Sequence, residues 1–282
     1  MDVTKPGPWD PTTEVAAVVH RGRVVDRRGD TGGVRRVASI TKLATSWAVL
    51  VAIEEGSVAL DDPVGPPGAT VAHLLAHASG LDFDTDRVLA APGVRRIYSN
   101  TGYELLGSHV EARTGLSFDT YLNEGVLAPL GMARSELRGS PAADLHSCVD
   151  DLVTLLGELR SPRLVDPSTA ERARTCAFPG LAGVLPGWGR QEPCDWGLGP
   201  ELRGDKQPHW MGRRCSPATF GHFGGSGTLL WFDPTVDLGC VVFADRAFDE
   251  WAVDVWPGQS DAVWSGWADR SSASSASSAA SG

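Results

Sequence analysis

The chain has 282 residues, of which 42% are hydrophobic, and it carries 35 acidic against 25 basic side chains for a net charge of −10. This length is enough for a sizeable core, in one large domain or two small ones. The negative charge argues against nucleic acid as a partner, because it would repel a phosphate backbone. No apolar run reaches the ~18 residues that a membrane span needs, so we expect no membrane partner either.

The N-terminus and the cysteines give no sign of export. Residues 1–8 lack the basic stretch and apolar run of a secretory signal, so we expect a cytoplasmic protein. The five cysteines are odd in number, widely spaced and without a C-x-x-C pair. This pattern predicts free, mostly buried thiols and no zinc site. They are Cys148, Cys176, Cys194, Cys215 and Cys240.

The first part of the chain predicts a hairpin and then a helix. Apolar stretches at 15–20 and 24–25 flank a glycine, which indicates a hairpin in a buried sheet. Between residues 39 and 55 the apolar side chains recur on one helical stripe, and Gly56 follows as a stop. Ser39 then lies at the N-cap or in the first turn of this helix. The stripe consists of Ile40, Leu43, Trp47, Leu50 and Val51.

The middle of the chain, residues 61–208, is rich in helical segments separated by Gly and Pro. The clearest helices are expected at 71–78, 101–114 and 150–159. Residues 179–200 hold too much Gly and Pro for a long helix, so we expect a loop with short strands there.

The C-terminal part returns to strands and ends in a helix. Strands are expected at 227–232 and 238–244, with an Asp-Pro turn between them. Residues 248–267 have a helical pattern that Pro257 is expected to break. Residues 271–282 contain only Ser and Ala before the final Gly, which predicts a disordered tail.

These elements predict a single domain at 13–268, between an N-terminal extension at 1–12 and the tail at 269–282. The two ends of the domain supply a sheet with packing helices, and its middle, about 61–208, supplies an inserted helical subdomain. Enzymes commonly place a cleft between two such lobes, so we expect a site that draws residues from both.

Ser39-x-x-Lys42 is the first motif with chemical meaning. Residues three apart share a helix face, so the hydroxyl and the amine can meet. A serine becomes a nucleophile when a neighbouring base takes its proton, and a lysine serves as that base if its pKa is lowered. The chain contains only three lysines, which makes a chance match less frequent. The alternative is a surface lysine one turn beyond a helix cap.

Tyr98-x-Asn100 is the second motif, in a chain with just three tyrosines. A phenol close to a cationic lysine can exist as phenolate or can relay a proton to a leaving group. Asn100 offers both a donor and an acceptor, which could hold a substrate amide or the lysine. The alternative is an ordinary loop that precedes a helix.

The third element is the glycine-rich stretch at 220–227, which leads into a strand and contains His222, Phe223, Gly224 and Gly225. Glycines let the backbone approach a ligand closely, and a strand edge can present N–H groups to a substrate. The alternative is a turn into a buried strand, with a structural imidazole at His222.

Together these motifs resemble class C β-lactamases and their esterase and D-peptidase relatives, within the serine β-lactamase and penicillin-binding-protein-like family. The three motifs occur in the order and approximate spacing of that family, and the resemblance covers about residues 15–267. The flanking stretches that share it are 56–63, 74–81, 98–103 and 129–132.

The resemblance implies an α+β fold, an antiparallel sheet flanked by helices with a helical subdomain. It implies that Ser39 is acylated, that Lys42 activates it, and that Tyr98 shuttles protons during acylation and deacylation. Asn100 would orient these groups and the substrate. The backbone N–H groups of Ser39 and Gly225 would form the oxyanion hole, with His222, Phe223 and Gly224 beside the substrate.

One departure from the family bears on the substrate. The third motif of β-lactamases usually begins with lysine followed by threonine or serine, and here it begins with His222 and Phe223. Near its ordinary pKa a histidine is largely neutral at pH 7, and phenylalanine has no hydroxyl. We therefore expect a preference for neutral esters or amides over β-lactam antibiotics, which carry a carboxylate.

The resulting expectation is a serine hydrolase that cleaves a small ester or amide through a Ser39 acyl-enzyme, with no metal and no cofactor. A D-amino-acid peptidase or amidase, a weak β-lactamase and an acyltransferase remain alternatives, and so does a non-catalytic ligand-binding module. Of the tryptophans, we expect Trp47, Trp251 and Trp264 in the core. Those expected to be candidate cleft walls are Trp188, Trp196 and Trp210.

Overall fold

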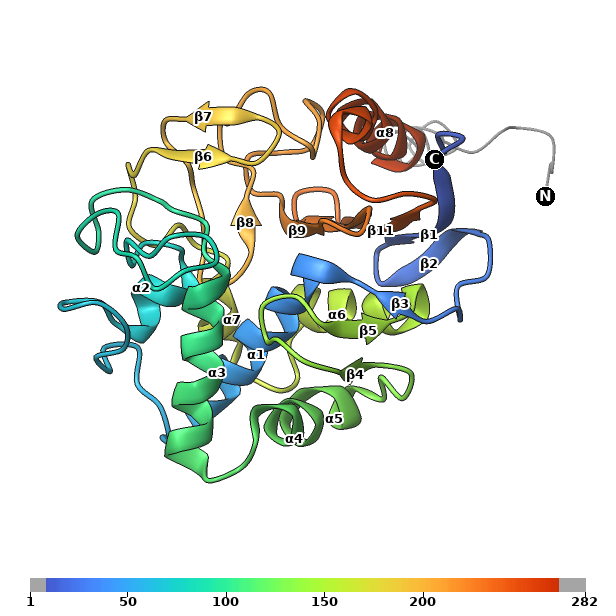
Figure 1. Ribbon diagram of the computed structural model, residues 1–282. Helices are drawn as coiled ribbons and strands as arrows, with labels where there is room; N and C mark the ends of the chain where they lie inside the picture. Colours follow the sequence, from blue (N-terminus) through green and yellow to red (C-terminus); the bar gives the residue numbers. More distant parts are fainter. Residues whose placement is uncertain (1–8, 269–282) are drawn as a thin grey trace, which may run out of the picture.

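A six-stranded antiparallel sheet forms the centre of the protein, in the strand order β2-β1-β11-β10-β9-β8 (Figure 1). The computed structural model describes residues 9–268, so the expected tail and residues 1–8 of the expected extension lie outside the described part. The sheet strands are β1 (Thr13–His20), β2 (Arg23–Arg28), β8 (Glu201–Leu202), β9 (Phe220–Gly224), β10 (Thr228–Asp233) and β11 (Leu238–Ala244).

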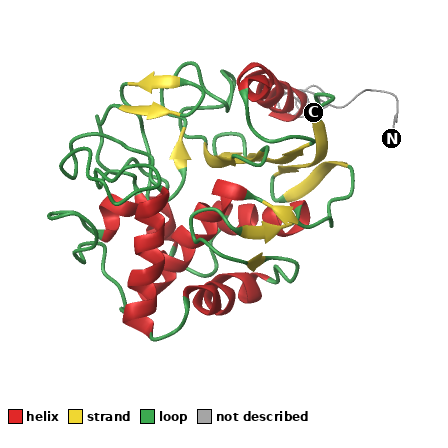
Figure 2. Cartoon of the chain, viewed as in Figure 1, coloured by secondary structure: helices red, strands yellow, loops and turns green. Residues whose placement is uncertain are grey.

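Helices cover both faces of this sheet, and most of them gather on one side of the molecule (Figure 2). The predicted antiparallel sheet flanked by helices is thereby confirmed. The helical elements are η1 (Ala38–Ile40), α1 (Thr41–Glu54), α2 (Val71–Leu75), α3 (Asn100–Thr114), α4 (Phe118–Leu122), η2 (Asn123–Leu127), α5 (Ala128–Leu130), α6 (Val149–Arg160), α7 (Pro167–Ala173) and α8 (Glu250–Ala268). Short strands complete the fold: β3 (Arg35–Arg36), β4 (Glu136–Leu137), β5 (Leu145–Ser147), β6 (Gly183–Leu185) and β7 (Gly189–Gln191).

The inner strands β1, β10 and β11 are buried on both faces, which explains why they are mostly apolar, whereas the edge strand β2 is polar and more exposed. In β10, Leu230 and Phe232 belong to the core cluster that contains α1 and α6. Leu229 and Trp231 belong to a second cluster with α8. Alternate residues of a strand point to opposite faces, so each strand contributes to two cores.

Helix α1 is buried all round, and 12 of its 14 residues have almost no contact with solvent. The predicted helix is confirmed and its apolar stripe is buried, and the remaining faces are buried as well because α1 lies between the sheet and the helices of the middle segment. A helix enclosed by protein on every side has no face reserved for water. The predicted helix also begins differently, since Ser39 lies in the short 3₁₀ turn η1 that precedes α1.

Helix α8 runs without interruption through Pro257, so the predicted break is wrong. A proline inside a helix costs about 3 kcal/mol, mainly through one lost hydrogen bond and a clash. Trp256 and Val263 of this helix are fully buried in the second core cluster. Burial of each such side chain contributes about 1.5–3 kcal/mol, so packing outweighs the local penalty.

Two further expectations can be compared with the described residues. All five cysteines are free, and four of them are buried, as predicted. Within residues 9–268, no helix combines the length and the apolar character that crossing a membrane would require.

The turn before Ser39 is held tightly against strand β9. Ala38 has a φ of +47°, a left-handed conformation that costs a residue other than glycine about 1–3 kcal/mol. Hydrogen bonds surround the turn: Thr228 Oγ1 donates to the Val37 carbonyl oxygen at 2.9 Å, and Thr41 Oγ1 donates to that of Ala38 at 2.6 Å. Gly224 packs directly against the turn. A Cβ atom there would lie 2.3 Å from the Val37 carbonyl oxygen.

We therefore expect Gly224→Ala to lower the free energy of unfolding by about 1–3 kcal/mol, as for other overpacked sites. Thermal melting followed by circular dichroism measures the effect. Gly225→Ala is the matched control, because a Cβ atom there meets no atom within 4 Å. Equal melting temperatures for the two variants would contradict the close packing of β9 on this turn.

Candidate active site

The structure brings Ser39 and Lys42 together. Ser39 lies in η1, and Lys42 lies in the first turn of α1. Lys42 Nζ is 3.3 Å from Ser39 Oγ, and the lysine is fully buried. The alternative of a surface lysine is thereby excluded.

The hydrogen bonds of Lys42 orient its amine. Nζ lies 2.5 Å from Asn100 Oδ1 and 2.9 Å from the carbonyl oxygen of Ala142. Both oxygens can only accept, so each takes one N–H bond. A neutral amine has just two N–H bonds and one lone pair. The lone pair is therefore left facing Ser39 Oγ, which is the geometry of a general base for that hydroxyl.

The protonation of Lys42 also suits this task. Burial lowers the pKa of Lys42 from its ordinary value to about 7, although the negative charges of Asp84 and Glu104 oppose the change. No carboxylate accepts a hydrogen bond from Nζ among its contacts in the described structure. At neutral pH a substantial share of the amine is therefore uncharged and able to take a proton.

Tyr98 lies next to both groups. Lys42 Nζ is 4.7 Å from the centre of the Tyr98 ring. Burial raises the pKa of Tyr98 far above its usual value, and a side-chain hydrogen bond with Ser39 offsets this only in part. Of the two forms that the sequence left open, the phenolate is disfavoured. Tyr98 is a neutral phenol that can pass a proton on.

His222 faces Tyr98 from strand β9. Its Nδ1 is 2.6 Å from the Phe223 carbonyl oxygen, which can only accept, so Nδ1 carries the proton. Nε2 is then an acceptor, 3.4 Å from the Tyr98 hydroxyl. Burial lowers the pKa of His222 to about 4. This lowered pKa favours the neutral form of His222 at pH 7, in line with the expectation from the sequence.

The other residues of the third motif have different surroundings. The Phe223 ring packs in the second core cluster, 5.1 Å from Phe248 and 5.6 Å from Trp256 between ring centres, and it also lines the cavity at Ser39. Gly224 is enclosed by the turn before Ser39. Gly225 lines the cavity with open space beside it. The assignment of the Ser39 and Gly225 N–H groups to an oxyanion hole stays a prediction.

Both polar atoms of the Asn100 side-chain amide form hydrogen bonds with other side chains. Its Oδ1 accepts from Lys42, and its Nδ2 donates to Asp84 Oδ1 at 2.7 Å. Of the roles that the sequence allowed, the structure shows Asn100 holding the lysine, while a contact with substrate stays a prediction. The sequence did not identify Asp84 as a site residue, because a single aspartate in a loop has no distinguishing pattern. Its carboxylate fixes the orientation of Asn100.

His77 is a second residue that sequence reasoning did not single out, although it lies in one of the flanking stretches of the resemblance. Its Nδ1 accepts from the backbone N–H of Ser99 at 3.1 Å. Its ring centre is 4.4 Å from that of Tyr98. His77 has a φ of +53° and is fully buried. It packs behind Tyr98 and restricts where the phenol can move.

Ser39 opens into a cavity of about 180 Å³ with a mostly apolar lining. Of the tryptophans expected as cleft walls, Trp196 lines this cavity. Trp188 and Trp210 are buried in the second core cluster. The complete lining is Ser39, Phe83, Tyr98, Leu185, Pro186, Trp196, His222, Phe223, Gly225 and Phe248. Within residues 9–268, no group of three or more His, Cys, Asp and Glu side chains is arranged to hold a metal ion.

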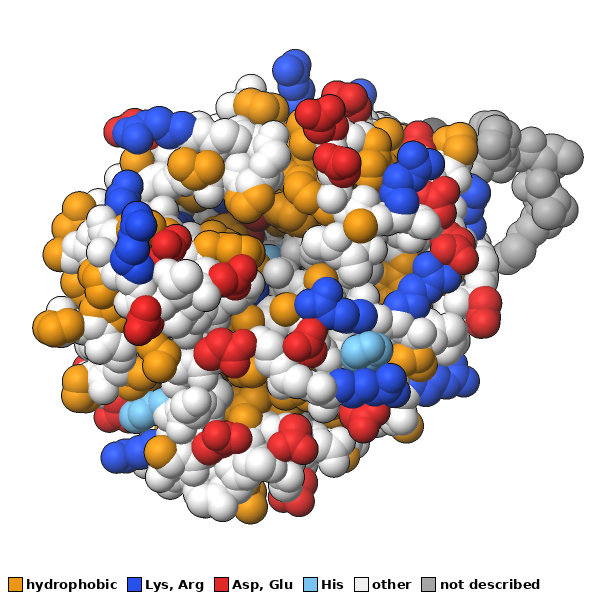
Figure 3. Space-filling view, in the orientation of Figure 1, with side chains coloured by type: hydrophobic (Ala, Val, Ile, Leu, Met, Phe, Trp, Pro, Cys, Tyr) orange, Lys and Arg blue, Asp and Glu red, His pale blue; other side chains and the backbone are white. Residues whose placement is uncertain are grey.

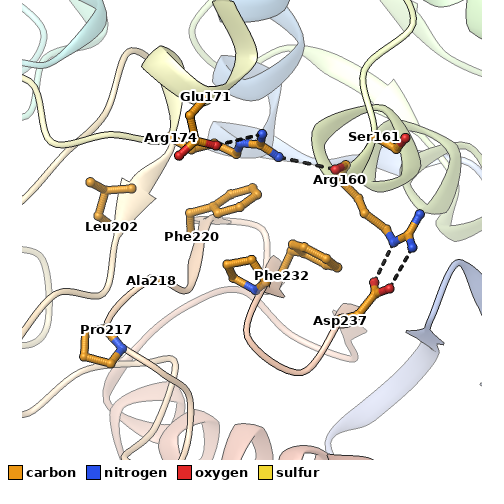
Figure 4. A pocket seen from close by; sticks show the side chains of 11 residues that line it. Arg160, Ser161, Glu171, Arg174, Leu202, Pro217, Ala218, Phe220, Phe232 and Asp237 are labelled. Carbon is orange, nitrogen blue, oxygen red and sulfur yellow. Dashed lines mark hydrogen bonds and ion pairs between the residues drawn. The ribbon is translucent and has the colours of Figure 1, made fainter. Parts of the chain in front are cut away.

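A larger cavity of about 450 Å³ lies elsewhere, between α6, α7 and the sheet (Figure 4). Its charged side chains are already paired. Arg160 donates two hydrogen bonds to the carboxylate of Asp237, at 2.5 and 2.7 Å. Arg174 donates to Glu171 at 3.1 Å. Because these pairs leave no poised base or free cation there, we place the candidate active site at Ser39.

Known proteins resemble the chain over most of its length. Residues 13–259 match the protein family described as Beta-lactamase. The chain is also similar to a β-lactamase of known structure from Mycobacterium bovis. The two are 47% identical, the match covers 92% of this chain and 97% of that one, and the TM-score is 0.89.

More distant relatives share the fold or part of the sequence. The chain is 28% identical over 151 residues to the D-alanyl-D-alanine-carboxypeptidase/endopeptidase AmpH of Escherichia coli strain K12, and this match covers 40% of the chain and 39% of AmpH. The matched part thus spans less than half the length of that relative. A simvastatin synthase mutant from Aspergillus terreus has a TM-score of 0.71 at 17% identity, with 91% of each chain covered. That likeness shows a shared fold.

The pKa of Lys42 sets the first expected outcome. Since the neutral amine is the active form and predominates above a pKa of about 7, kcat/KM for an activated ester is expected to rise with pH through neutrality and then level off. A pH–rate profile with p-nitrophenyl acetate measures this. A rate that does not change across neutral pH would contradict the role of Lys42 as base.

Substitution of Lys42 tests the same role. Lys42→Arg keeps a cation that cannot be deprotonated, so the acylation rate is expected to fall by about two orders of magnitude or more. Lys42→Met removes the base without burying a charge, and its acylation rate is expected to fall by a similar factor. Melting curves check that both variants fold. Near wild-type acylation in the folded Met variant would exclude Lys42 as the base.

Asp84 gives a third expected outcome. Its negative charge raises the pKa of Lys42, so Asp84→Asn is expected to move the midpoint of the pH–rate profile to lower pH. The variant keeps an oxygen that can accept from Asn100. Asp86→Asn, in the same loop, is the control and should leave the midpoint in place. An unshifted midpoint in Asp84→Asn would show that this carboxylate does not act on the lysine.

Proposed function

Because the chain belongs to the β-lactamase family of serine hydrolases, we propose that it hydrolyses a neutral ester or amide through an acyl-enzyme on Ser39. The observation that carries the proposal is the amine of Lys42. It is buried, its two N–H bonds are taken by Asn100 and Ala142, and its lone pair faces the serine.

Acylation follows from these contacts. Ser39 Oγ attacks the carbonyl carbon while its proton passes to Lys42, and the carbonyl oxygen becomes an oxyanion. The bond to the leaving group then breaks. Tyr98 donates its phenolic proton to the departing oxygen or nitrogen and recovers a proton from the Lys42 ammonium. The products of this stage are the acyl-enzyme, a free alcohol or amine and a neutral Lys42.

Deacylation uses the same groups in reverse. Water replaces the departed group beside Tyr98 and attacks the ester carbon of the acyl-enzyme. Its proton passes through Tyr98 to Lys42 as the new bond forms. When the bond between the carbonyl carbon and Ser39 Oγ breaks, the ammonium of Lys42 returns a proton to the serine, and the acid is released.

The preference for neutral substrates rests on the lining of the Ser39 cavity. Neither lysine nor arginine is among the side chains that line it in the described structure, and His222 is neutral at pH 7. A carboxylate on the substrate would therefore find no cation in this cavity. Loss of one charged hydrogen bond weakens binding by about 1.5–3 kcal/mol, or roughly tenfold to a hundredfold.

β-Lactams are the second candidate substrate, because the relative from M. bovis is described as a β-lactamase and is 47% identical. A D-alanyl peptide is a further alternative, since AmpH is described as a carboxypeptidase and endopeptidase. Both classes carry a carboxylate near the reacting carbonyl. The uncharged cavity makes each a weaker candidate than a neutral ester.

A non-catalytic binding module is the alternative from another class. Such a module has no need of a buried lysine whose pKa is lowered to about 7, and burying that amine is unfavourable for folding. A panel of nitrophenyl esters, D-amino-acid amides and β-lactams, followed by intact-mass measurement, distinguishes these possibilities. We expect acyl adducts with the esters, absent in Ser39→Ala. No adduct with any compound would favour the binding module.

We expect wild-type kcat/KM for a neutral nitrophenyl ester to exceed that for penicillins and cephalosporins. His222→Lys introduces a cation beside the cavity and is expected to shift the ratio towards β-lactams by roughly tenfold or more. The substitution is made alone because Phe223 is part of the aromatic core, where truncation would cost about 3–5 kcal/mol. Wild-type hydrolysis of penicillins above that of esters would show that other residues hold the anion.

A further inference from the structure

A second, larger cavity adjoins the one at Ser39. It has a volume of about 600 Å³, and it shares Phe83, Tyr98 and Pro186 with the Ser39 cavity. We call this larger cavity the side groove. Its walls are the segment 83–98 on one side and residues 182–190, which include β6, on the other.

These two walls are joined by backbone hydrogen bonds. The N–H of Arg96 donates to the Ala182 carbonyl oxygen at 2.9 Å, and Arg96 forms a parallel bridge with Gly183. The side groove therefore has a fixed floor and is a preformed feature. Preformed concave surfaces beside a reactive group are where small ligands commonly bind.

The lining of the side groove is mostly apolar, and three of its apolar side chains are unusually exposed. The exposed fractions are 47% for Phe83, 62% for Val94 and 66% for Val184. Only three other large hydrophobic residues in the described part of the chain are exposed. Figure 3 shows hydrophobic side chains gathered around a hollow in the middle of one face. Apolar surface concentrated at one place generally marks a binding surface.

The arginines of the side groove do not make it an anion site. Arg96 is buried and donates to four backbone carbonyl oxygens, those of Ala76, Ala177, Phe178 and Cys194. Arg190 is paired with Glu192 at 2.9 Å. Arg95 donates to the Leu89 carbonyl oxygen at 3.0 Å. Arg96 is thus fully engaged, whereas Arg95 and Arg190 are exposed at the edge of the side groove, where water screens their charges.

The sizes of the two cavities also indicate that a substrate extends from the Ser39 cavity into the side groove. Ligand pockets usually measure about 300–1,000 Å³. The Ser39 cavity, at about 180 Å³, holds little more than the reacting ester or amide and its nearest atoms. A larger substrate has to continue elsewhere, and the side groove is joined to this cavity through shared lining residues.

We propose that the side groove binds an apolar chain of the substrate, so that the preferred substrates are esters or amides with a chain of about six or more carbons. This proposal rests on the proposed function. The chain belongs either to the acyl part or to the departing alcohol, and two series of esters separate these sources. Acetates of ethanol to decanol lengthen the alcohol, and nitrophenyl acetate to decanoate lengthens the acyl part.

One of the two series is expected to show kcat/KM rising about fourfold for each added methylene until the side groove is filled, the change expected for burying one methylene group. Val94→Asp and Val184→Asp should abolish this rise and leave the shortest ester unaffected. Val34→Asp and Leu116→Asp are matched controls, because these residues are exposed to 43% and 40% and lie outside the side groove. Rates independent of chain length in both series would overturn the proposal.

A binding measurement distinguishes failure of the side groove from failure of the proposed function. Ser39→Ala cannot form an acyl-enzyme, so calorimetry reports binding alone, with ethyl, hexyl and decyl acetate for the alcohol part and with ethyl acetate, hexanoate and decanoate for the acyl part. Affinity that rises with chain length, and that Val184→Asp removes, supports the side groove even if the wild type cleaves no ester. Affinity that does not depend on chain length, with short esters still hydrolysed by the wild type, rejects the side groove and leaves the proposed function standing.

Discussion

Burial of Lys42 without a carboxylate partner is the constraint on which the rest of the site depends. A buried ammonium is unfavourable, and a neighbouring carboxylate would stabilise it and keep it protonated. Here the amine meets Asn100 Oδ1 and the Ala142 carbonyl oxygen, neutral acceptors that restrict its orientation while favouring its charge less than a carboxylate would. The negative charge of Asp84, whose carboxylate accepts a hydrogen bond from Asn100, opposes the effect of burial on the pKa of Lys42. The complete enclosure of α1 between the sheet and the helices of the middle segment provides this environment.

The same enclosure determines where the nucleophile lies. Ser39 follows a residue in a left-handed conformation, and that turn persists because hydrogen bonds from Thr228 and Thr41 and the close approach of Gly224 hold it. The third motif thus has two distinct tasks. Gly224 packs against the turn that carries Ser39, whereas His222 faces the phenol of Tyr98. These tasks explain why a stretch with little reactive chemistry of its own accompanies the serine and the lysine.

Much of this arrangement could be predicted from local sequence. Ser39 and Lys42 meet because of a spacing of three, and strand β11 was predicted at its observed bounds because every residue in it is apolar or small. The continuity of α8 through Pro257 could not be predicted, since it depends on packing against the sheet. Asp84 depends on a contact with Asn100, 16 residues further along the chain. The side groove depends on contacts between two distant segments, such as that of Arg96 with Ala182. Such contacts leave no periodicity in the sequence.

The parts of the site differ in how far they tolerate change. Near Ser39, the backbone of β9 packs directly against the backbone of the preceding turn. A single added carbon at Gly224 would collide with the Val37 carbonyl oxygen. The walls of the side groove instead end in side chains that face solvent, such as Val94 and Val184. Evolution can therefore alter what the protein accepts by exchanging a few surface residues, without rebuilding the chemistry beneath. A mutant library aimed at new substrates should vary those two walls, because substitutions of exposed side chains disturb the packed core least.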